Sequence, residues 1–226
     1  MEYIVMKISG SLLEDPPKDF YARLRSEVLS LRDRFGIVIV AGGGRLARDR
    51  VKVLEGLGMP KGIRDLAGIE AARLNAFTLA AALHPYSPLE VPRTVYEVLE
   101  ALGRGMIPVV GGFQPGQSTN AVSAVIADTI GARLIINLLH GVQGIYDRDP
   151  GSPGARMLSR VCYDEMEGII ARFSQEPGGY TLFDRVALEI VRRSGIDVVF
   201  ADGRDPRVIG RIIEDPSSTG SMLTSC

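Results

Sequence analysis

Short apolar runs recur along the chain and are separated by longer amphipathic stretches. The runs are rich in Val and Ile and show no regular alternation with polar residues, which predicts strands buried on both faces. They cover residues 2–8, 36–41, 106–110, 133–139 and 196–201. We therefore expect a sheet whose two faces are both covered.

The stretches between these runs carry apolar residues at helical spacing. The first follows Pro16 and Pro17 and reads Phe20, Leu24, Val28, Leu31 and Phe35, which predicts a helix after a proline start. Further helices are predicted over residues 45–57, 65–83, 119–130 and 180–194. Strands alternating with helices predict an α/β fold with a mostly parallel sheet, in which ligands bind beyond the carboxyl ends of the strands.

Composition narrows the class of protein. With 226 residues, 46% of them hydrophobic, the chain can bury the core of one globular domain. The net charge is -1 and the 22 Arg residues are scattered, so nucleic acid is not expected as a partner. No run approaches the roughly 18 apolar residues of a membrane span, and the N-terminus has no signal-peptide layout. We expect no membrane association and a cytoplasmic location.

Cysteine and histidine are scarce. Cys162 and Cys226 are too few for a disulfide framework and lack metal-ligand spacing. With only His84 and His140 besides, a zinc site has no support either.

Glycine or small polar residues follow three of the predicted strands. Ser9, Gly10 and Ser11 follow the first, Gly42–Gly44 the second, and Gly111–Gly112 a later one. Glycine lets backbone N–H groups approach an anion, and a following helix adds its positive end. A single turn of this kind needs no ligand, but three at one sheet edge favour a phosphate site.

Two familiar nucleotide motifs do not explain these glycines. Residues 42–47 match the dinucleotide fingerprint G-x-G-x-x-A, but no second strand ending in an acidic residue follows about 20 positions later. A Walker P-loop is absent. If the chain binds ATP, the phosphates must therefore contact a different kind of loop.

Three charged residues stand near these turns. Lys7, one of only 4 Lys residues, lies near the end of a buried strand, where an ammonium needs an anionic partner or a solvated strand end. Arg48 lies one turn into the next helix, where it could reach the same anion or simply face solvent. Asp65 opens a predicted helix, either as an N-cap or as an acceptor for ribose hydroxyls.

Side-chain amides cluster in one loop. Gln114, Gln117 and Asn120 are three of the seven Asn and Gln residues of the chain. Gln114 and Gln117 lie between Gly111–Gly112 and the predicted helix over residues 119–130, and Asn120 lies at the start of that helix. We call residues 113–120 the amide loop.

The ordered stretches KISGS, VAGGGRLAR, RDLAGIEAARLNA, GGFQPGQST and GIYDRDP resemble the archaeal branch of the uridylate (UMP) kinases in the amino acid kinase superfamily. The resemblance runs from about Lys7 to Gly195, and its most specific element is G-G-x-x-P-G-x-[ST]-T. It implies a three-layer α/β/α sandwich around a mostly parallel sheet of about eight strands, formed by residues 1–226 as one domain. It also implies a homohexamer and transfer of the ATP γ-phosphoryl group to UMP with Mg²⁺, in pyrimidine nucleotide (CTP) biosynthesis.

The resemblance also implies roles for matching positions. The N-terminal part would bind UMP and the C-terminal part ATP, with Lys7 and Arg48 as the catalytic residues and no metal ligand among the protein side chains. ATP would contact Lys7, Ile8, Ser9, Gly10, Ser11, Gly44, Arg48, His140, Tyr146 and Asp149. UMP would contact Gly43, Asp65, Phe113, Gln114, Pro115, Gly116, Gln117, Ser118 and Thr119.

These roles suit the chemistry. A side-chain amide offers both a hydrogen-bond donor and an acceptor. Recognition of uracil requires both, because its edge carries N–H and C=O groups. The acceptor is already an anionic phosphate oxygen, so the reaction needs no general base, only positioning and charge stabilisation.

The chain departs from the family at two places. Relatives usually read T-N-V-D-G-V-Y where this chain has residues 140–146, HGVQGIY. Asn120 stands where some superfamily members carry an Asp that orients the phosphate-binding lysine. Two alternatives therefore stay open: a kinase for another small phosphate or carboxylate acceptor, and a non-catalytic nucleotide- or oxyanion-binding relative.

Overall fold

A central sheet of seven strands organises the part of the chain that the computed structural model describes, residues 1–173 and 182–226. The strand order is β3-β2-β1-β4-β8-β9-β7. Pairing is parallel from β3 through β8, whereas β9 runs antiparallel to β8 and parallel to β7. The bounds are β1 (Glu2–Ile8), β2 (Phe35–Ala41), β3 (Val109–Val110), β4 (Leu134–Leu139), β7 (Arg160–Cys162), β8 (Asp197–Asp202) and β9 (Ser221–Thr224). A separate pair, β5 (Ile145–Tyr146) and β6 (Met157–Leu158), is antiparallel.

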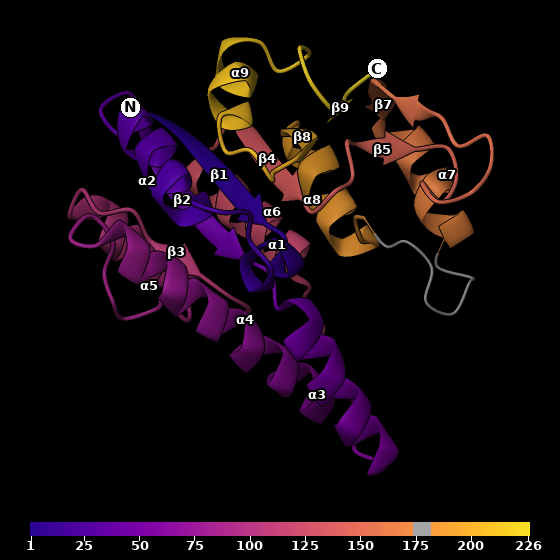
Figure 1. The fold of residues 1–226 in the computed structure, drawn as a ribbon, viewed down its shortest axis with the longest axis horizontal. Coiled ribbons are helices and arrows are strands. Elements are labelled where there is room, and N and C mark those ends of the chain that lie inside the picture. The colour runs from indigo at the N-terminus through magenta and orange to yellow at the C-terminus, as the bar shows by residue number, and fades with distance from the viewer. Residues whose placement is uncertain (174–181) are drawn as a thin grey trace.

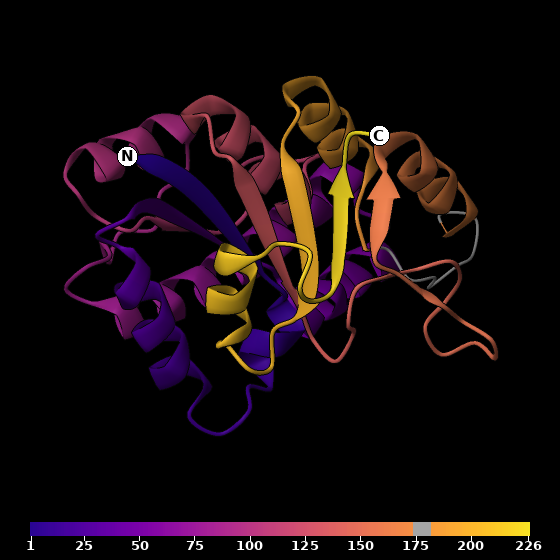
Figure 2. The same ribbon diagram turned by 90° about the horizontal axis from the view of Figure 1, so that it is seen from above.

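Helices cover both faces of the sheet (Figures 1 and 2). One core cluster joins the sheet to α5 (Val95–Gly103), α6 (Thr119–Ile130), α7 (Tyr163–Phe173) and α8 (Arg185–Ser194). The other joins it to α1 (Gly10–Glu14), α2 (Phe20–Leu31), α4 (Lys61–Leu83) and α9 (Val208–Glu214). The expected three-layer α/β/α arrangement with a mostly parallel sheet is confirmed.

Helices α3 (Gly44–Gly56) and α4 project together away from the sheet (Figure 1). No residue of α3 is buried, while α4 buries an Ala- and Leu-rich side. By length and composition α4 could cross a membrane. Its contacts with α3, β2 and β3 instead make it a helix of the fold.

Several element bounds differ from the prediction. Phe35 begins β2 instead of ending the preceding helix, which stops at Leu31. β3 is only two residues long, and Pro108, which has no N–H to donate, precedes it. Helix α8 begins at Arg185, and residues 180 and 181 of its predicted start lie outside the described residues.

Helix α5 was not predicted although the sequence contains its start signal. Thr94 accepts a hydrogen bond from the Glu97 N–H at 3.3 Å, and the Glu97 carboxylate reaches back to the Arg93 N–H at 2.6 Å. This is the S/T-x-x-E pattern of a capping box.

The two cysteines form one disulfide, Cys162–Cys226. They are 64 positions apart in sequence, yet their Cα atoms lie 5.4 Å apart because β7 and β9 are neighbours. Two cysteines make no framework, but the sequence did not predict this bridge.

Candidate functional site

The turns after β1 and β2 press against each other at the carboxyl edge of the sheet. A Cβ atom on Gly10 would lie 2.0 Å from the Gly44 nitrogen, and one on Gly42 would lie 2.7 Å from the Gly10 nitrogen. The Gly42 N–H donates to the Ile8 carbonyl at 2.8 Å. These glycines are therefore required by the close approach of two backbones, which brings the amides of both turns to one place.

Close packing explains why glycine follows β3 at positions 111 and 112. A Cβ atom on Gly111 would lie 2.6 Å from the Arg73 nitrogen in α4, and one on Gly112 would lie 2.7 Å from the Ile69 side chain. For this turn the simpler interpretation, a tight contact between strand and helix, accounts for both residues.

Lys7 lies on β1 between Val40 of β2 and Asn137 of β4. Burial removes water from its ammonium and lowers its pKa from 10.5 to about 8, while the negative charge of Asp184 acts in the opposite direction. Within residues 1–173 and 182–226, no group hydrogen-bonds to or forms an ion pair with this ammonium. Lys7 is thus a desolvated cation whose ammonium has no bonded partner among the described residues.

Asp184 is the residue near Lys7 that the sequence reasoning missed. It caps α8 by accepting the Ala187 N–H at 3.1 Å, and it also accepts the Ser118 hydroxyl. Ser118 in turn caps α6, accepting the N–H groups of Asn120 and Ala121 at 3.1 Å each. Asp184 therefore connects the amide loop to the strand end that holds Lys7. An Asp before a helical pattern signals a cap, but nothing in the sequence pairs it with Lys7.

Asn120 does not contact Lys7 in the way expected of the Asp found in some relatives. It is buried, donates to the Leu182 carbonyl at 3.1 Å, and accepts a hydrogen bond from Asn137 at 3.2 Å. The Asn137 Oδ1 atom is buried and has no hydrogen-bond partner among the described residues. The carboxylate whose negative charge raises the pKa of Lys7 is that of Asp184.

A cavity of about 450 Å³ lies between α3, α4 and the amide loop. Asp65 lines it from inside α4, which begins at Lys61, so the N-cap interpretation of Asp65 is wrong. Its Oδ2 atom accepts the Gly116 N–H at 2.9 Å, and Gly116 has a positive φ of 82° that favours glycine. The predicted residues that line this cavity are Gly43, Asp65, Gly116, Gln117, Ser118 and Thr119.

Three predicted members of the amide loop do not line the cavity. Phe113 packs against the hydrophobic core, whereas Gln114 and Pro115 are exposed. The Gln114 carbonyl accepts the Gln117 N–H at 3.3 Å and thereby closes the turn.

A second cavity, of about 440 Å³, gathers Ser11, Arg48 and His140 with Glu14, Asp15 and Arg45. The Arg48 Nη2 donates to the Ser11 hydroxyl at 3.5 Å. Residues far apart in sequence, from the turn after β1, from α3 and from the end of β4, thus meet here.

The segment that follows His140 is held by β8 and β9. The Gly141 N–H donates to Asp202 at 3.2 Å, and the Ile145 N–H donates to the buried Ser221 hydroxyl at 2.8 Å. Tyr146 lies on β5 opposite Met157, and Asp149 accepts the Gly151 N–H at 2.7 Å in the loop beyond. Neither Tyr146 nor Asp149 lines the second cavity.

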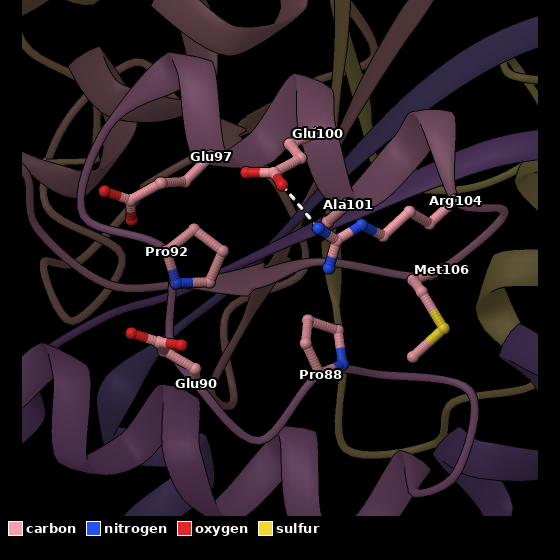
Figure 3. Close-up of a pocket in the computed structure, with 8 residues that line it drawn as sticks. All are labelled: Pro88, Glu90, Pro92, Glu97, Glu100, Ala101, Arg104 and Met106. Atoms are coloured by element: carbon pink, nitrogen blue, oxygen red, sulfur yellow. Dashed lines mark hydrogen bonds and ion pairs between the residues drawn. The ribbon is translucent and has the colours of Figure 1, made fainter.

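A larger cavity, of about 490 Å³, lies at the opposite, amino end of β3 (Figure 3). Glu97 is already bonded to the Arg93 N–H, and Glu100 to Arg104. None of the predicted site residues lines it; the lining consists of Pro88, Glu90, Pro92, Glu97, Glu100, Ala101, Arg104 and Met106. We do not assign the candidate site there.

The described residues contain no group of three or more His, Cys, Asp or Glu side chains that could hold a metal ion. The site residues are instead suited to anions: one ammonium, one guanidinium and the backbone amides of two glycine turns.

Comparisons with known proteins show the family to which the chain belongs. Residues 2–202 match the model of the amino acid kinase family. The chain is 49% identical to a uridylate kinase of Aeropyrum pernix, over 91% of this chain and 92% of the relative, and 41% identical to one of Hyperthermus butylicus, over 98% and 97%. The crystal structure of uridylate kinase from Archaeoglobus fulgidus superimposes with a TM-score of 0.86 at 28% identity, covering 99% of this chain and 100% of that one. The chain belongs to the amino acid kinase family, on its uridylate kinase branch.

Proposed function

We propose that this protein is a UMP kinase that transfers the γ-phosphoryl group of ATP to UMP. The observation that carries the proposal is the cavity in which Asp65 and the amide loop face Gly43. A carboxylate that can accept ribose hydroxyls and a side-chain amide that can pair with uracil suit a uridine monophosphate. Of the three clustered amides only that of Gln117 lines this cavity, because Gln114 is exposed and Asn120 is buried. The uridylate kinase relatives support the same acceptor.

The reaction needs charge and positioning from this chain. A phosphate oxygen of UMP attacks the γ-phosphorus, the bond from that phosphorus to the β,γ-bridging oxygen breaks, and ADP leaves with the electron pair. Lys7 and Arg48 are proposed to neutralise the transferring group, and the amides of Gly10 and Gly44 to hold its oxygens. Asp184 keeps the Lys7 ammonium protonated against the effect of burial.

The proposed ATP side uses the second cavity. Ser11 and Arg48 would meet the phosphates, and His140 would lie toward the nucleoside. Ile8 and Ser9 would contribute through the turn after β1, and Tyr146 and Asp149 through the β5–β6 segment. Because the described residues offer no cluster of metal ligands, the Mg²⁺ expected with ATP would be held by phosphate oxygens.

Assembly as a homohexamer is part of the proposal. Helices α3 and α4 expose Val53, Leu57, Leu74 and Phe77 by 48–65%. Apolar side chains grouped on a projecting helix pair are typical of a subunit interface. We further propose that residues 1–226 act as one domain in the cytoplasm, in the pathway from UMP to CTP.

The test is ADP release from ATP and Mg²⁺ at high temperature with a panel of acceptors. The panel contains UMP, dUMP, CMP, AMP, GMP, carbamate and isopentenyl phosphate. Turnover with UMP far above the others is expected, because UMP alone in the panel combines uracil, for the amide loop, with a ribose 2′-hydroxyl, for Asp65.

Two results would instead support the alternatives. Faster turnover with carbamate or isopentenyl phosphate would identify a kinase for another small acceptor. No turnover with any of these acceptors, while nucleotides still raise the melting temperature, would identify a binding protein.

A further inference from the structure

Helix α3 begins at the centre of the proposed phosphate site without a side-chain cap of its own. Its N-cap residue is Gly43, and its first residue, Gly44, has a positive φ of 64°. The first N–H groups of any helix have no partner within the helix. How each of these donors is satisfied decides where an anion can bind.

Glu14, which lies in another helix, accepts hydrogen bonds from two of these donors. Its Oε2 atom accepts the Arg45 N–H at 2.6 Å, and its Oε1 atom accepts the Leu46 N–H at 2.7 Å. Glu14 is the last residue of α1, the short helix that begins directly after the β1 turn. A Cβ atom on Gly44 would lie 2.5 Å from the Glu14 carboxyl carbon, so only glycine at position 44 admits this contact.

The next two donors toward the turn are open. Neither the Gly43 nor the Gly44 N–H has a hydrogen-bond partner in the part of the chain that the structure describes. The start of α3 thus has two amides bonded to a carboxylate and two amides with no hydrogen-bond partner among the described residues. These open amides belong to the glycines to which the proposed function assigns phosphate contacts.

We propose that Glu14 is a positioning residue for phosphoryl transfer. Its carboxylate joins α1 to α3 and so fixes Ser11 and Gly10 relative to Gly44 and Arg48. It also accepts the N–H groups of Arg45 and Leu46, so that phosphate at the start of α3 can bind only to the Gly43 and Gly44 amides. The proposal rests on the proposed UMP kinase function, because it concerns where the transferring phosphate lies.

A helix cap with no part in the reaction is the competing explanation. Both roles predict some loss of stability when Glu14 is removed. Both roles also vacate two amides at the positive end of the helix dipole, so an anion gains access to them in either case. Only the positioning role predicts that kcat falls more than KM for UMP rises, because Ser11 and Gly10 are then no longer fixed relative to Gly44 and Arg48. This kinetic change therefore separates the two explanations.

The experiment compares Glu14→Ala and Glu14→Gln with the matched control Glu97→Ala. Glu97 also accepts a backbone N–H at a helix start, by α5, and lies outside both site cavities. We expect Glu14→Ala to bind inorganic phosphate about tenfold more tightly than the unmodified protein in calorimetry, with Glu14→Gln in between. We also expect phosphate to become a stronger inhibitor, and kcat to fall more than KM for UMP rises.

The control should lose thermal stability without any change in phosphate binding or kinetics. Unchanged kcat in Glu14→Ala, alongside a lower melting temperature, would overturn the proposal in favour of a plain cap. A higher kcat would also overturn it, since Glu14 would then be competing with the substrate phosphate.

Calorimetry does not depend on turnover. If the unmodified protein binds phosphate but has no activity with UMP, the proposed function fails, while the phosphate affinities still show whether Glu14 keeps anions off the Arg45 and Leu46 amides.

Discussion

The acceptor and donor sides of the candidate site are built in different ways. On the proposed acceptor side, the predicted Asp65 accepts the N–H of the predicted Gly116, and the predicted Ser118 donates to Asp184, which was not predicted. On the donor side, the backbone after His140 is held instead by Asp202 and Ser221, which no motif pointed to. The proposed acceptor side is thus supported mainly by motif residues, whereas the proposed donor side depends on β8 and β9, which come late in the chain.

This difference explains why residues 140–146 can depart from the family pattern. The donor segment, residues 140–146, is held through backbone N–H groups, which do not depend on side-chain type. Glycine is required only at Gly141, where φ is 71°, and at Gly144, which packs against Ser221. The amide loop contributes side chains and a glycine with positive φ, which few residues can replace. The following predictions test this contrast, from the largest expected effect to the smallest.

Substitution of Lys7 should affect both sides, because it lies between them. Lys7→Met should slow turnover by about 10²- to 10³-fold, since it removes a cation that stabilises the transferring group. It should also raise the melting temperature at neutral pH, because the desolvated charge is lost. Steady-state kinetics and calorimetric melting would measure these effects, and a lower melting temperature would contradict the assigned burial.

The pKa of Lys7 gives the same prediction a pH dependence. Its value of about 8 in the folded protein is lower than its usual 10.5. The kcat/KM should therefore fall above about pH 8 as the ammonium is lost. Between these two pH values the unfolded chain binds more protons than the folded one, so the stability of ligand-free protein should rise with pH. Asp184→Asn should move the kinetic decline to lower pH.

Substitution of Asp65 should act on the acceptor side alone. Asp65→Asn should raise KM for UMP about 10- to 100-fold, because charge-assisted hydrogen bonds to ribose become neutral ones. The KM for ATP should stay constant. Asp49→Asn, on the exposed part of the neighbouring helix α3, is the control. Equal changes in both KM values would contradict the separation of the two sides.

Loss of the disulfide should act on the donor side and on stability. Closing a loop of 64 residues contributes about 4 kcal/mol in the chain-entropy model. Cys226→Ser should lower the melting temperature and modestly raise KM for ATP, because β9 carries the Ser221 that holds Ile145. A change in KM for UMP of the same size would show that β9 supports both sides.

His140→Ala should have the smallest effect, about a threefold rise in KM for ATP. The backbone of the donor segment stays in place, so only a side-chain contact is lost. Titration of ATP at saturating UMP would measure it. Turnover slowed by about two orders of magnitude would instead place His140 among the residues that act on the transferring phosphate.

The elements that are buried on most of their surface could be predicted from the sequence. These elements are the strands β1, β2 and β4 and the helix α6. Burial between two layers requires apolar residues at most of their positions, and this requirement is visible in the sequence. The strands β7 and β9 are short and have few apolar residues, and their pairing joins distant parts of the chain. Local patterns carry no information on such pairing, so the disulfide was missed with it.

The sequence by itself determined which chemical groups are present and where each stands relative to its own strand or helix. Lys7, Gly10, Gly44 and Asp65 were identified because turn and helix chemistry is local and short in range. Only the tertiary structure decided which of these groups meet. Asp184 beside Lys7 and Glu14 on the start of α3 are 177 and 31 positions from their partners. Their contacts arise from packing between layers, which brings distant segments together and leaves no periodic signal in the chain.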